Sequence, residues 1–296
     1  MTTVQLAAAD VAGLIPEVAR HLEAAGVYFG HGTANATDEA AALVFFALRL
    51  DHAQPEAGYA TRVGPPERER VAALLQRRVV DREPLPYLTG EAWFAGLSFA
   101  VDECVLVPRS PIAELITTRF EPWVVPDRIG RVLEIGTGSG CIAIGCALAF
   151  PCATVVATDI SAAALRVAAA NVRRHGVTDR VALVETDHAN GIRGPFDLIV
   201  SNPPYVPCGE VSGLPREYAH EPELGLISGS DGLDSARRIL QDAAQLLGSG
   251  GTLVLEVGAQ WQALQQAFPR IPFTWVEFAH GGVGVAVVGQ ADLANM

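Results

Sequence analysis

The sequence predicts an α/β protein in which a mostly parallel sheet, with helices on both faces, follows a small helical region. Three observations lead to this fold class. From about residue 112 onward, short apolar segments typical of strands alternate with segments of helical spacing. A glycine-rich turn directly follows the first of these strands, residues 131–135. Residues 1 to about 85, by contrast, repeat their apolar side chains at helical intervals.

The composition is that of a folded, acidic protein. The chain has 296 residues, of which 50% are hydrophobic and 18% are charged, which excludes intrinsic disorder and indicates about two domains. The formal net charge is −12, and all 21 basic residues are Arg. Such a chain lacks the basic footprint needed to bind naked DNA. It is compatible with a basic protein partner.

Cysteine usage and the chain start indicate a cytoplasmic protein. The five cysteines include no C-x-x-C pair, which favours free thiols over disulfides or a zinc site. The first ten residues lack the basic region and cleavage site of a signal peptide. The uncharged stretch between Glu134 and Asp159 contains several glycines and Pro151. We therefore interpret it as a loop, a helix and a strand and expect no membrane partner.

Three helices are predicted at the beginning of the chain. Apolar spacing predicts the first over Val11–Leu22, beginning near Pro16 or kinked by it. Thr37 is the predicted N-cap of the second, and acids follow in its first turn. Pro65 opens a third helix, which ends by Pro84.

The remaining elements follow from strand and helix spacing. Residues 91–107 are predicted to form a β-hairpin. Predicted strands are 131–135, 153–158, 181–185, 196–201, 251–257, 273–278 and 284–288. Helices are predicted near 139–149, 161–174, 231–247 and 259–267.

The glycine-rich turn is the first candidate site. Glu134 stands at the end of its strand, and Gly136, Gly138 and Gly140 alternate before an apolar helix. Such glycines let the backbone approach a ligand and turn sharply into a helix N-terminus. Asp159 ends the next strand and suits a ribose diol. Because the spacing is G-x-G-x-G rather than that of dinucleotide-binding proteins, S-adenosylmethionine is the favoured ligand. Asp187, after the third strand, is either an acceptor for an adenine amine or a surface acid.

The segment Asn202-Pro203-Pro204-Tyr205, after the fourth strand, is the second candidate site. The Asn202 amide oxygen and the Pro203 carbonyl offer two acceptors to a planar –NH2 group. Holding both N–H bonds turns the nitrogen lone pair toward an electrophile, and Tyr205 offers a flat face for the planar group. This pattern predicts methylation of a conjugated nitrogen. The candidate groups are adenine, cytosine and the side-chain amide of glutamine.

The charge of the chain next to this segment distinguishes nucleic-acid substrates from protein substrates. Between Gly209 and Asp234 there are six acids and one base, Arg216. A local charge of −5 beside the site is expected to repel phosphates and to attract a basic protein.

Both motifs and the helical N-terminal region resemble the protein glutamine methyltransferases that modify translation components. Four segments are more similar to the members acting on the third protein of the large ribosomal subunit than to those acting on release factors. These segments are residues 28–40, 91–116, 217–233 and 272–285. A release-factor substrate and a nucleic-acid amine substrate remain the alternatives.

The resemblance implies a fold, a cofactor and site residues. The fold is a seven-stranded class I (Rossmann-like) methyltransferase sheet with its last strand antiparallel, over residues 108–296. A helical substrate-recognition domain, residues 1–90, is joined to it by the hairpin 91–107. Asn202, Pro203, Pro204 and Tyr205 hold the glutamine amide. S-adenosylmethionine contacts Glu134, Gly136, Thr137, Gly138, Gly140, Asp159, Ile160, Asp187, His188 and Asn202. His188 departs from the family, which usually has a large apolar or aromatic residue there.

Three further residues have open roles. His31 is interpreted as a turn histidine. Arg109 is either an anchor for a ligand carboxylate or part of an interdomain ion pair. Trp93, with Phe94, belongs either to the hairpin core or to a substrate groove.

Overall fold

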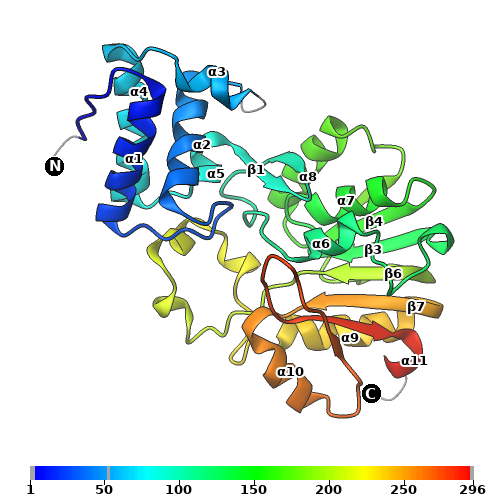
Figure 1. Ribbon diagram of the computed structural model, residues 1–296. Coiled ribbons are helices and arrows are strands. Elements are labelled where there is room, and N and C mark those ends of the chain that lie inside the picture. The colour runs from blue at the N-terminus through cyan, green and yellow to red at the C-terminus, as the bar shows by residue number, and fades with distance from the viewer. Residues whose placement is uncertain (1–3, 52–53, 294–296) are drawn as a thin grey trace. The chain divides into compact units, whose positions relative to one another are not determined.

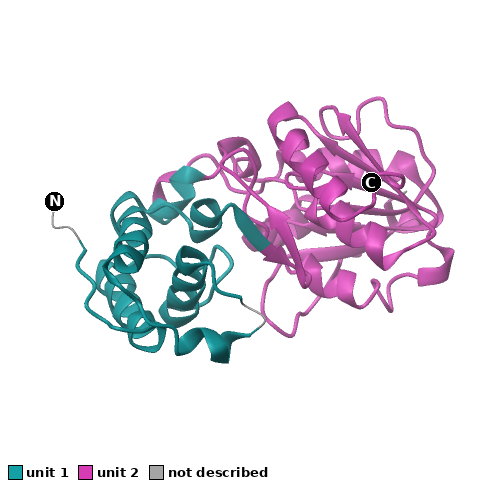
Figure 2. Ribbon diagram, turned by 90° about the horizontal axis from the view of Figure 1, so that it is seen from above, with its two compact units in different colours: residues 1–92, 215–220 teal, residues 93–214, 221–296 magenta. Residues whose placement is uncertain are grey.

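The computed structural model describes residues 4–51 and 54–293. The chain divides into two compact units (Figure 2). Unit 1 consists of residues 1–92 together with 215–220, and unit 2 of residues 93–214 together with 221–296. Residues 215–220 follow the Asn-Pro-Pro-Tyr segment in sequence. The chain therefore contributes six residues to unit 1 from the middle of the region that forms unit 2.

Unit 1 is helical, as predicted. Its helices are α1 (Val11–Ala25), α2 (Ala36–Leu48), α3 (Pro55–Tyr59), α4 (Pro65–Gln76), the π-helical turn η1 (Arg77–Asp81) and α5 (Leu85–Thr89) (Figure 1). Helix α1 begins at the Asp10 cap and runs through Pro16. The predicted cap of α2 was wrong: the Asn35 side chain accepts from the Asp38 N–H, and Thr37 lies within the helix. Asn35 is in the extended conformation that an N-cap requires.

A buried ion cluster lies in the core of unit 1. Arg78 is fully buried, and its Nε donates to Glu39 (2.5 Å) while one terminal nitrogen donates to Glu217 (3.0 Å). The other terminal nitrogen donates to the Tyr28 carbonyl (2.7 Å). Glu217, from the segment 215–220, also accepts from the Tyr28 N–H (2.9 Å). Every charge of this cluster is thus hydrogen-bonded, which is the condition under which charged groups are tolerated in a core.

Unit 2 contains the predicted sheet. In its described residues, seven strands are ordered β5-β4-β3-β6-β7-β9-β8. The strands are β3 (Arg131–Ile135), β4 (Thr154–Asp159), β5 (Val181–Glu185), β6 (Phe196–Ser201), β7 (Leu247–Glu256), β8 (Thr274–Trp275) and β9 (Val285–Gly289). Strands β3 to β7 pair in parallel, and β9 is antiparallel to β7. The predicted class I methyltransferase architecture, with its last strand antiparallel, is confirmed. The predicted strand 273–278 is reduced to β8.

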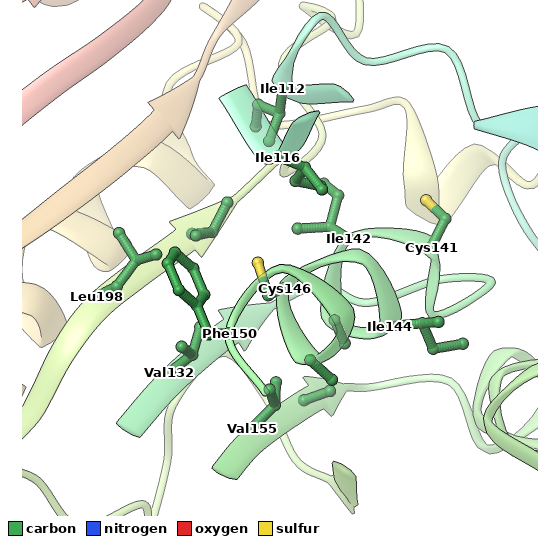
Figure 3. Packing of buried hydrophobic residues seen from close by; sticks show 14 of the residues in the cluster. Ile112, Ile116, Val132, Cys141, Ile142, Ile144, Cys146, Phe150, Val155 and Leu198 are labelled. Carbon is green, nitrogen blue, oxygen red and sulfur yellow. The ribbon is translucent and has the colours of Figure 1, made fainter. Parts of the chain in front are cut away.

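Helices cover both faces of this sheet (Figure 1). Successive residues of a strand point to opposite faces, so Val132 packs on one side and Leu133 on the other. The first face is covered by α6 (Ile112–Thr117), α7 (Cys141–Ala149) and α8 (Ala162–Arg174), and Figure 3 shows its packing around Phe150 and Cys146. The second face is covered by α9 (Asp234–Leu246), α10 (Trp261–Ala267) and α11 (Gln290–Leu293). Helices α6 and α11 were not predicted.

The predicted hairpin is shorter than expected. It consists of β1 (Glu91–Phe94) and β2 (Leu97–Ala100), and residues 101–107 form no strand. Phe94 is buried against Phe99, whereas Trp93 is 64% exposed, so Trp93 is not part of the hairpin core. The buried Asn171 of α8 exchanges hydrogen bonds with the backbone of Ala100 and also donates to the Ser139 carbonyl. Asn171 thereby fastens β2 to the glycine-rich turn.

Two further features concern helix length and the cysteines. Among the described residues, no helix is long and apolar enough to cross a membrane. All five cysteines lie in the described part of the chain and are free. Only Cys141 and Cys146 are buried.

The ion cluster of unit 1 predicts unequal roles for two adjacent arginines. Arg78→Met is expected to lower the free energy of unfolding by about 3–5 kcal/mol, because two buried carboxylates lose their shared partner. Arg77→Met is the matched control: Arg77 is half-exposed and pairs with Glu83, and such pairs contribute about 1 kcal/mol or less. Urea unfolding of both variants at neutral pH measures the difference.

The same cluster predicts a pH dependence. Burial raises the pKa of Glu217, but hydrogen bonds from the Tyr28 N–H and from Arg78 outweigh it and lower the pKa below its ordinary value. A lowered carboxyl pKa stabilises the folded state above the unfolded pKa, and this stabilisation is lost as the pH falls. The parent should therefore lose more stability than Arg78→Met on acidification. Equal acid sensitivity of the two proteins would contradict the assignment.

Candidate active site

The register of the central strands brings three predicted residues to one edge of the sheet. Ile135 of β3 lies opposite Thr158 of β4 and also opposite Ser201 of β6. The residues that follow are Gly136, Asp159 and Asn202, and they therefore leave the sheet at the same level. The order of the strands reverses between β3 and β6, and ligands of open α/β sheets bind at such a switch point.

A cavity of about 250 Å³ lies at this edge. It is lined by eleven of the predicted site residues: Glu134, Gly136, Thr137, Gly138, Asp159, Ile160, Asp187, His188, Asn202, Pro203 and Pro204. Gly140 and Tyr205 are not among its lining residues. The other walls were not predicted from the sequence, and they include residues 104–108, Ser110, the 222–227 segment, and Ser235 and Ile239 of α9.

The glycine-rich turn presents bare backbone to open space. Gly136 (φ 77°) and Gly138 (φ 53°) are left-handed, and a Cβ on either would meet no atom within 4 Å. Their Cα atoms therefore face room that a ligand can occupy. Gly140 (φ 82°) has a different role, because a Cβ there would lie 3.3 Å from Ala168 of α8. It allows helices α7 and α8 to pack closely.

Asp159 holds the turn and retains free acceptor capacity. Its Oδ2 accepts from the Gly138 N–H and its Oδ1 from the Ser161 N–H, both at 2.8 Å. Each carboxylate oxygen can accept a further hydrogen bond. Asp159 is only half-buried and lines the cavity, so a diol can reach it.

Asp187, His188 and Ile160 form another part of the cavity wall. The His188 Nδ1 lies 2.7 Å from the Asp187 Oδ1, and His188 has a left-handed backbone (φ 51°). Ile160 is 51% exposed at the wall. An apolar surface beside a polar edge is a suitable surface for a planar heterocycle.

The Asn-Pro-Pro-Tyr segment leaves its acceptors available. Among the described residues, no hydrogen bond engages the Asn202 side chain or the Pro203 carbonyl, and both residues line the cavity. Tyr205 instead packs its ring on Gly258, where a Cβ would lie 2.7 Å from the ring. The predicted flat face for a substrate is thus turned at least partly toward the protein.

Arg109 has an identified partner. It donates to both oxygens of Glu221, at 2.5 and 2.7 Å, and Glu221 is buried. Both residues belong to unit 2, so this is not the interdomain ion pair considered from the sequence. The pair fastens the segment before α6 to the segment that carries Pro222 and Leu224, and both segments line the cavity.

The expected charge of the 209–234 segment is largely neutralised. Glu217 pairs with Arg78 in unit 1, Glu221 with Arg109, and Asp231 and Asp234 with Arg237. The interpretation of this segment as a free acidic surface was therefore wrong. That interpretation still applies to two exposed acids, Glu210 and Glu223.

Glu134 is a buried carboxyl on the cavity wall. Burial raises its pKa to about 8, although the Thr137 hydroxyl donates to it at 2.5 Å and opposes the shift. A group with this pKa responds to charge brought into the cavity. In the described residues, no group of three or more His, Cys, Asp or Glu side chains could hold a metal ion.

The fold and the cavity together define the methyltransferase class. Residues 116–213 match the family model described as "Methyltransferase small domain". Among solved structures, the catalytic domain of hMettl16, crystallised with an RNA hairpin, shares the fold with a TM-score of 0.52 at 18% identity. That match covers 78% of this chain and 84% of the other.

Curated relatives identify the family. A ribosomal protein uL3 glutamine methyltransferase of Xanthomonas campestris pv. campestris is 48% identical, over 97% of this chain and 94% of the relative. The enzyme of the same name from Neisseria gonorrhoeae is 45% identical, over 91% and 90%. The chain belongs to the family of ribosomal protein uL3 glutamine methyltransferases. The resemblance identified from the sequence is confirmed.

The raised pKa of Glu134 predicts a stabilising substitution. A carboxyl whose folded pKa is raised stabilises the folded state at low pH, and this contribution is lost as the pH rises through about 8. Glu134→Gln cannot ionise, so in the cofactor-free protein it should be more stable than the parent near pH 9, by on the order of 3 kcal/mol.

Thermal unfolding between pH 5 and 9 measures this effect. The two proteins should have similar stability near pH 5, where Glu134 is protonated in the parent. Glu185→Gln, an exposed carboxyl at the end of β5, is the control and should follow the parent throughout. A constant offset between Glu134→Gln and the parent at every pH would mean that Glu134 does not titrate in this range.

Proposed function

We propose that the protein transfers a methyl group from S-adenosylmethionine to the side-chain amide nitrogen of a glutamine in ribosomal protein uL3, in the cytoplasm. The main supporting observation is that the Asn202 side chain and the Pro203 carbonyl accept no hydrogen bond from the described residues. Both line the same cavity as the glycine-rich turn. The names of the relatives support the choice of amide and of protein.

The donor set suits the proposed methyl donor. Asp159 retains lone pairs for a ribose diol, and Gly136 and Gly138 leave room for close backbone approach. Ile160 and His188 offer surfaces for the adenine, with Asp187 at its polar edge. S-adenosylmethionine supplies an electrophilic methyl group on a sulfonium. Glu134, as a carboxyl close to ionisation at neutral pH, is suited to balance cationic charge.

The corner residues orient and activate the amide. The Asn202 oxygen and the Pro203 carbonyl accept the two N–H bonds of a glutamine amide, which draws the nitrogen lone pair out of conjugation. The prolines carry no N–H and have fixed φ angles, so the two acceptors are preorganised. The transfer forms an N–C bond, breaks the S–C bond of the donor and releases one amide proton to water. Positioning supplies most of the rate enhancement, and a strong base is not required.

Recognition of the protein substrate rests less on the acidic segment than its sequence indicated. Leu224 lines the cavity and is 58% exposed, so it is suited to contact the polypeptide beside the target glutamine. Trp93 offers a second exposed apolar surface in unit 2. The remaining exposed acids, Glu210 and Glu223, contribute long-range attraction to a basic protein.

The test is methylation of purified substrates. The protein is incubated with S-adenosylmethionine and, separately, with uL3, a peptide release factor and duplex DNA. Tandem mass spectrometry should locate one added methyl group on a glutamine of uL3. Preferential modification of the release factor would show that the substrate is a release factor and not uL3. Modification of DNA with none of uL3 would overturn the proposal.

Loss of the Asp159 carboxylate should weaken cofactor binding. Asp159→Ala is expected to reduce affinity for S-adenosylmethionine by about 1.5–3 kcal/mol, the contribution of a hydrogen bond to a charged group. Asp159→Asn keeps one accepting oxygen and should lose less. Calorimetry measures both, with the exposed Asp179→Ala as control. Unchanged affinity in Asp159→Ala would remove Asp159 from the cofactor site.

Loss of the Asn202 amide should affect turnover more than binding. Asn202→Ala is expected to lower kcat by roughly 100-fold or more while changing cofactor affinity little, because the lost contact serves the reacting amide. Single-turnover kinetics and calorimetry separate the two effects. Asn190→Ala removes an exposed amide outside the cavity wall and should leave both unchanged. A near-parental single-turnover rate in Asn202→Ala would contradict the assignment.

A further inference from the structure

Glu256 is a buried carboxyl next to the corner that the chemistry above does not use. It is the last residue of β7 and only 4% exposed. Its two oxygens contact two different segments: the Ser110 hydroxyl donates to Oε2 at 2.5 Å, and the Tyr205 hydroxyl donates to Oε1 at 3.4 Å. Glu256 thus links the segment before α6 with the end of the Asn-Pro-Pro-Tyr corner.

Glycines hold Tyr205 against this carboxyl. Gly258 (φ 49°) lies directly against the tyrosine ring, and a Cβ there would come within 2.7 Å of it. Gly232 (φ 78°) lies against the Tyr205 backbone, where a Cβ would come within 2.3 Å of the carbonyl oxygen. Gly258 is itself enclosed, because a Cβ on Gly284 would lie 2.0 Å from its carbonyl. The ring and the backbone of Tyr205 are therefore both confined.

The position of Tyr205 determines that of the acceptors. Between Asn202 and Tyr205 there are only two prolines, whose rings fix φ. A displacement of Tyr205 is therefore transmitted to the Pro203 carbonyl and to Asn202. The 3.4 Å contact is long for an O–H···O hydrogen bond. Hydrogen bonds of this kind often tighten only when the substrates are bound.

We propose that Glu256 is a positioning residue for methyl transfer: through Tyr205 it holds the Asn202 amide and the Pro203 carbonyl in the geometry that the glutamine nitrogen requires. The proposal rests on the function proposed above and names a further residue of the same site. The two oxygens of Glu256 must accept from the Ser110 and Tyr205 hydroxyls at once. In the carboxylate form both oxygens are acceptors, whereas protonation turns one of them into a donor.

The surroundings of Glu256 connect this role to pH. Burial raises the pKa of Glu256 to about 7, and the Ser110 hydrogen bond, the Arg109 charge and the Tyr205 hydroxyl oppose the shift. Arg109 and Tyr205 are the charged and titratable groups that act on it, and Glu221 partly neutralises Arg109. On β9, the residue opposite Glu256 is Val285, which adds no charge. As the pH falls below about 7, Glu256 takes up a proton and the alignment of Tyr205 weakens.

The experiment compares Glu256→Gln, Glu256→Ala and Tyr205→Phe with the parent, using Glu277→Gln as the control for loss of an exposed carboxyl. Single-turnover rates on uL3, KM for S-adenosylmethionine and thermal unfolding are measured between about pH 5.5 and 9. We expect Glu256→Ala and Tyr205→Phe to lower the rate roughly tenfold or more with KM for S-adenosylmethionine within about twofold.

Two signatures separate positioning from stability. Glu256→Gln should fold as the parent does and lose the fall in rate below about pH 7. The double variant Glu256→Gln/Tyr205→Phe should be no slower than the slower single variant, because both substitutions remove the same contact. The control Glu277→Gln should retain the parental rate and pH profile. Parental rates and pH profiles in both Glu256→Gln and Tyr205→Phe would overturn the proposal.

Failure of the proposed function has a different signature. A parent protein that methylates no glutamine of uL3 or of a release factor overturns the proposed function itself. In that case a crystal structure of Glu256→Ala decides the positioning role. Tyr205 should leave its place on Gly258, and an unmoved Tyr205 would refute the claim.

Discussion

The candidate site depends on the parallel register of β3, β4 and β6, in which Ile135 lies opposite both Thr158 and Ser201. This single alignment brings a glycine-rich turn, a carboxylate and an amide to one sheet edge, although they come from three separate parts of the chain. Because side chains alternate along a strand, a slip of one residue in β6 would exchange its two faces and carry Asn202 away from the cavity. The two apolar clusters on either face oppose such a slip, so the packed core and the site geometry have a common cause.

Three buried carboxyls have pKa values that are shifted in opposite directions in the two units. Glu217 meets a fully buried arginine and a backbone N–H, and its pKa is lowered. Glu134 lines the cavity, and Glu256 contacts Ser110, which also lines it. Both carboxyls receive hydroxyl groups instead, and their pKa values are raised to about 8 and about 7. A hydroxyl compensates a buried charge less completely than a guanidinium does. The site thus holds groups near their ionisation point, at the expense of stability, whereas the core of unit 1 holds a satisfied cluster.

The acidic segment shows why local charge counts are weak evidence for a binding surface. Residues 209–234 carry a sequence charge of −5, which indicated an attractive surface for a basic protein. Most of these acids instead form ion pairs with arginines that lie outside the segment. Glu217 is buried in the core of unit 1, and Glu221 is buried in unit 2, where it pairs with Arg109 of the cavity wall. Specificity for a protein substrate then has to be sought in exposed apolar positions such as Leu224 as well as in charge.

Local patterns predicted much of the fold. Strands β3, β5 and β6 have the predicted bounds, since each is a short apolar segment closed by turn residues. Helix α6 was missed because it has only six residues, too few for a periodic signal. The cap of α2 was misplaced because Asn35 and Thr37 are both good caps, and only the backbone conformation distinguishes them.

By itself, the sequence determined the fold class, the order of the elements, the glycine-rich turn and the Asn-Pro-Pro-Tyr corner. Each of these depends on residues that are neighbours in the chain, where periodicity, glycine and proline act directly. Only the tertiary structure decided which acid meets which arginine, that Tyr205 is held by Glu256 and Gly258, and that Ser110 reaches the same carboxyl. Arg78 and Glu217 are 139 residues apart, and Ser110 and Glu256 are 146 apart. No local pattern carries information over such distances, because these partners are chosen by the packing of the whole domain.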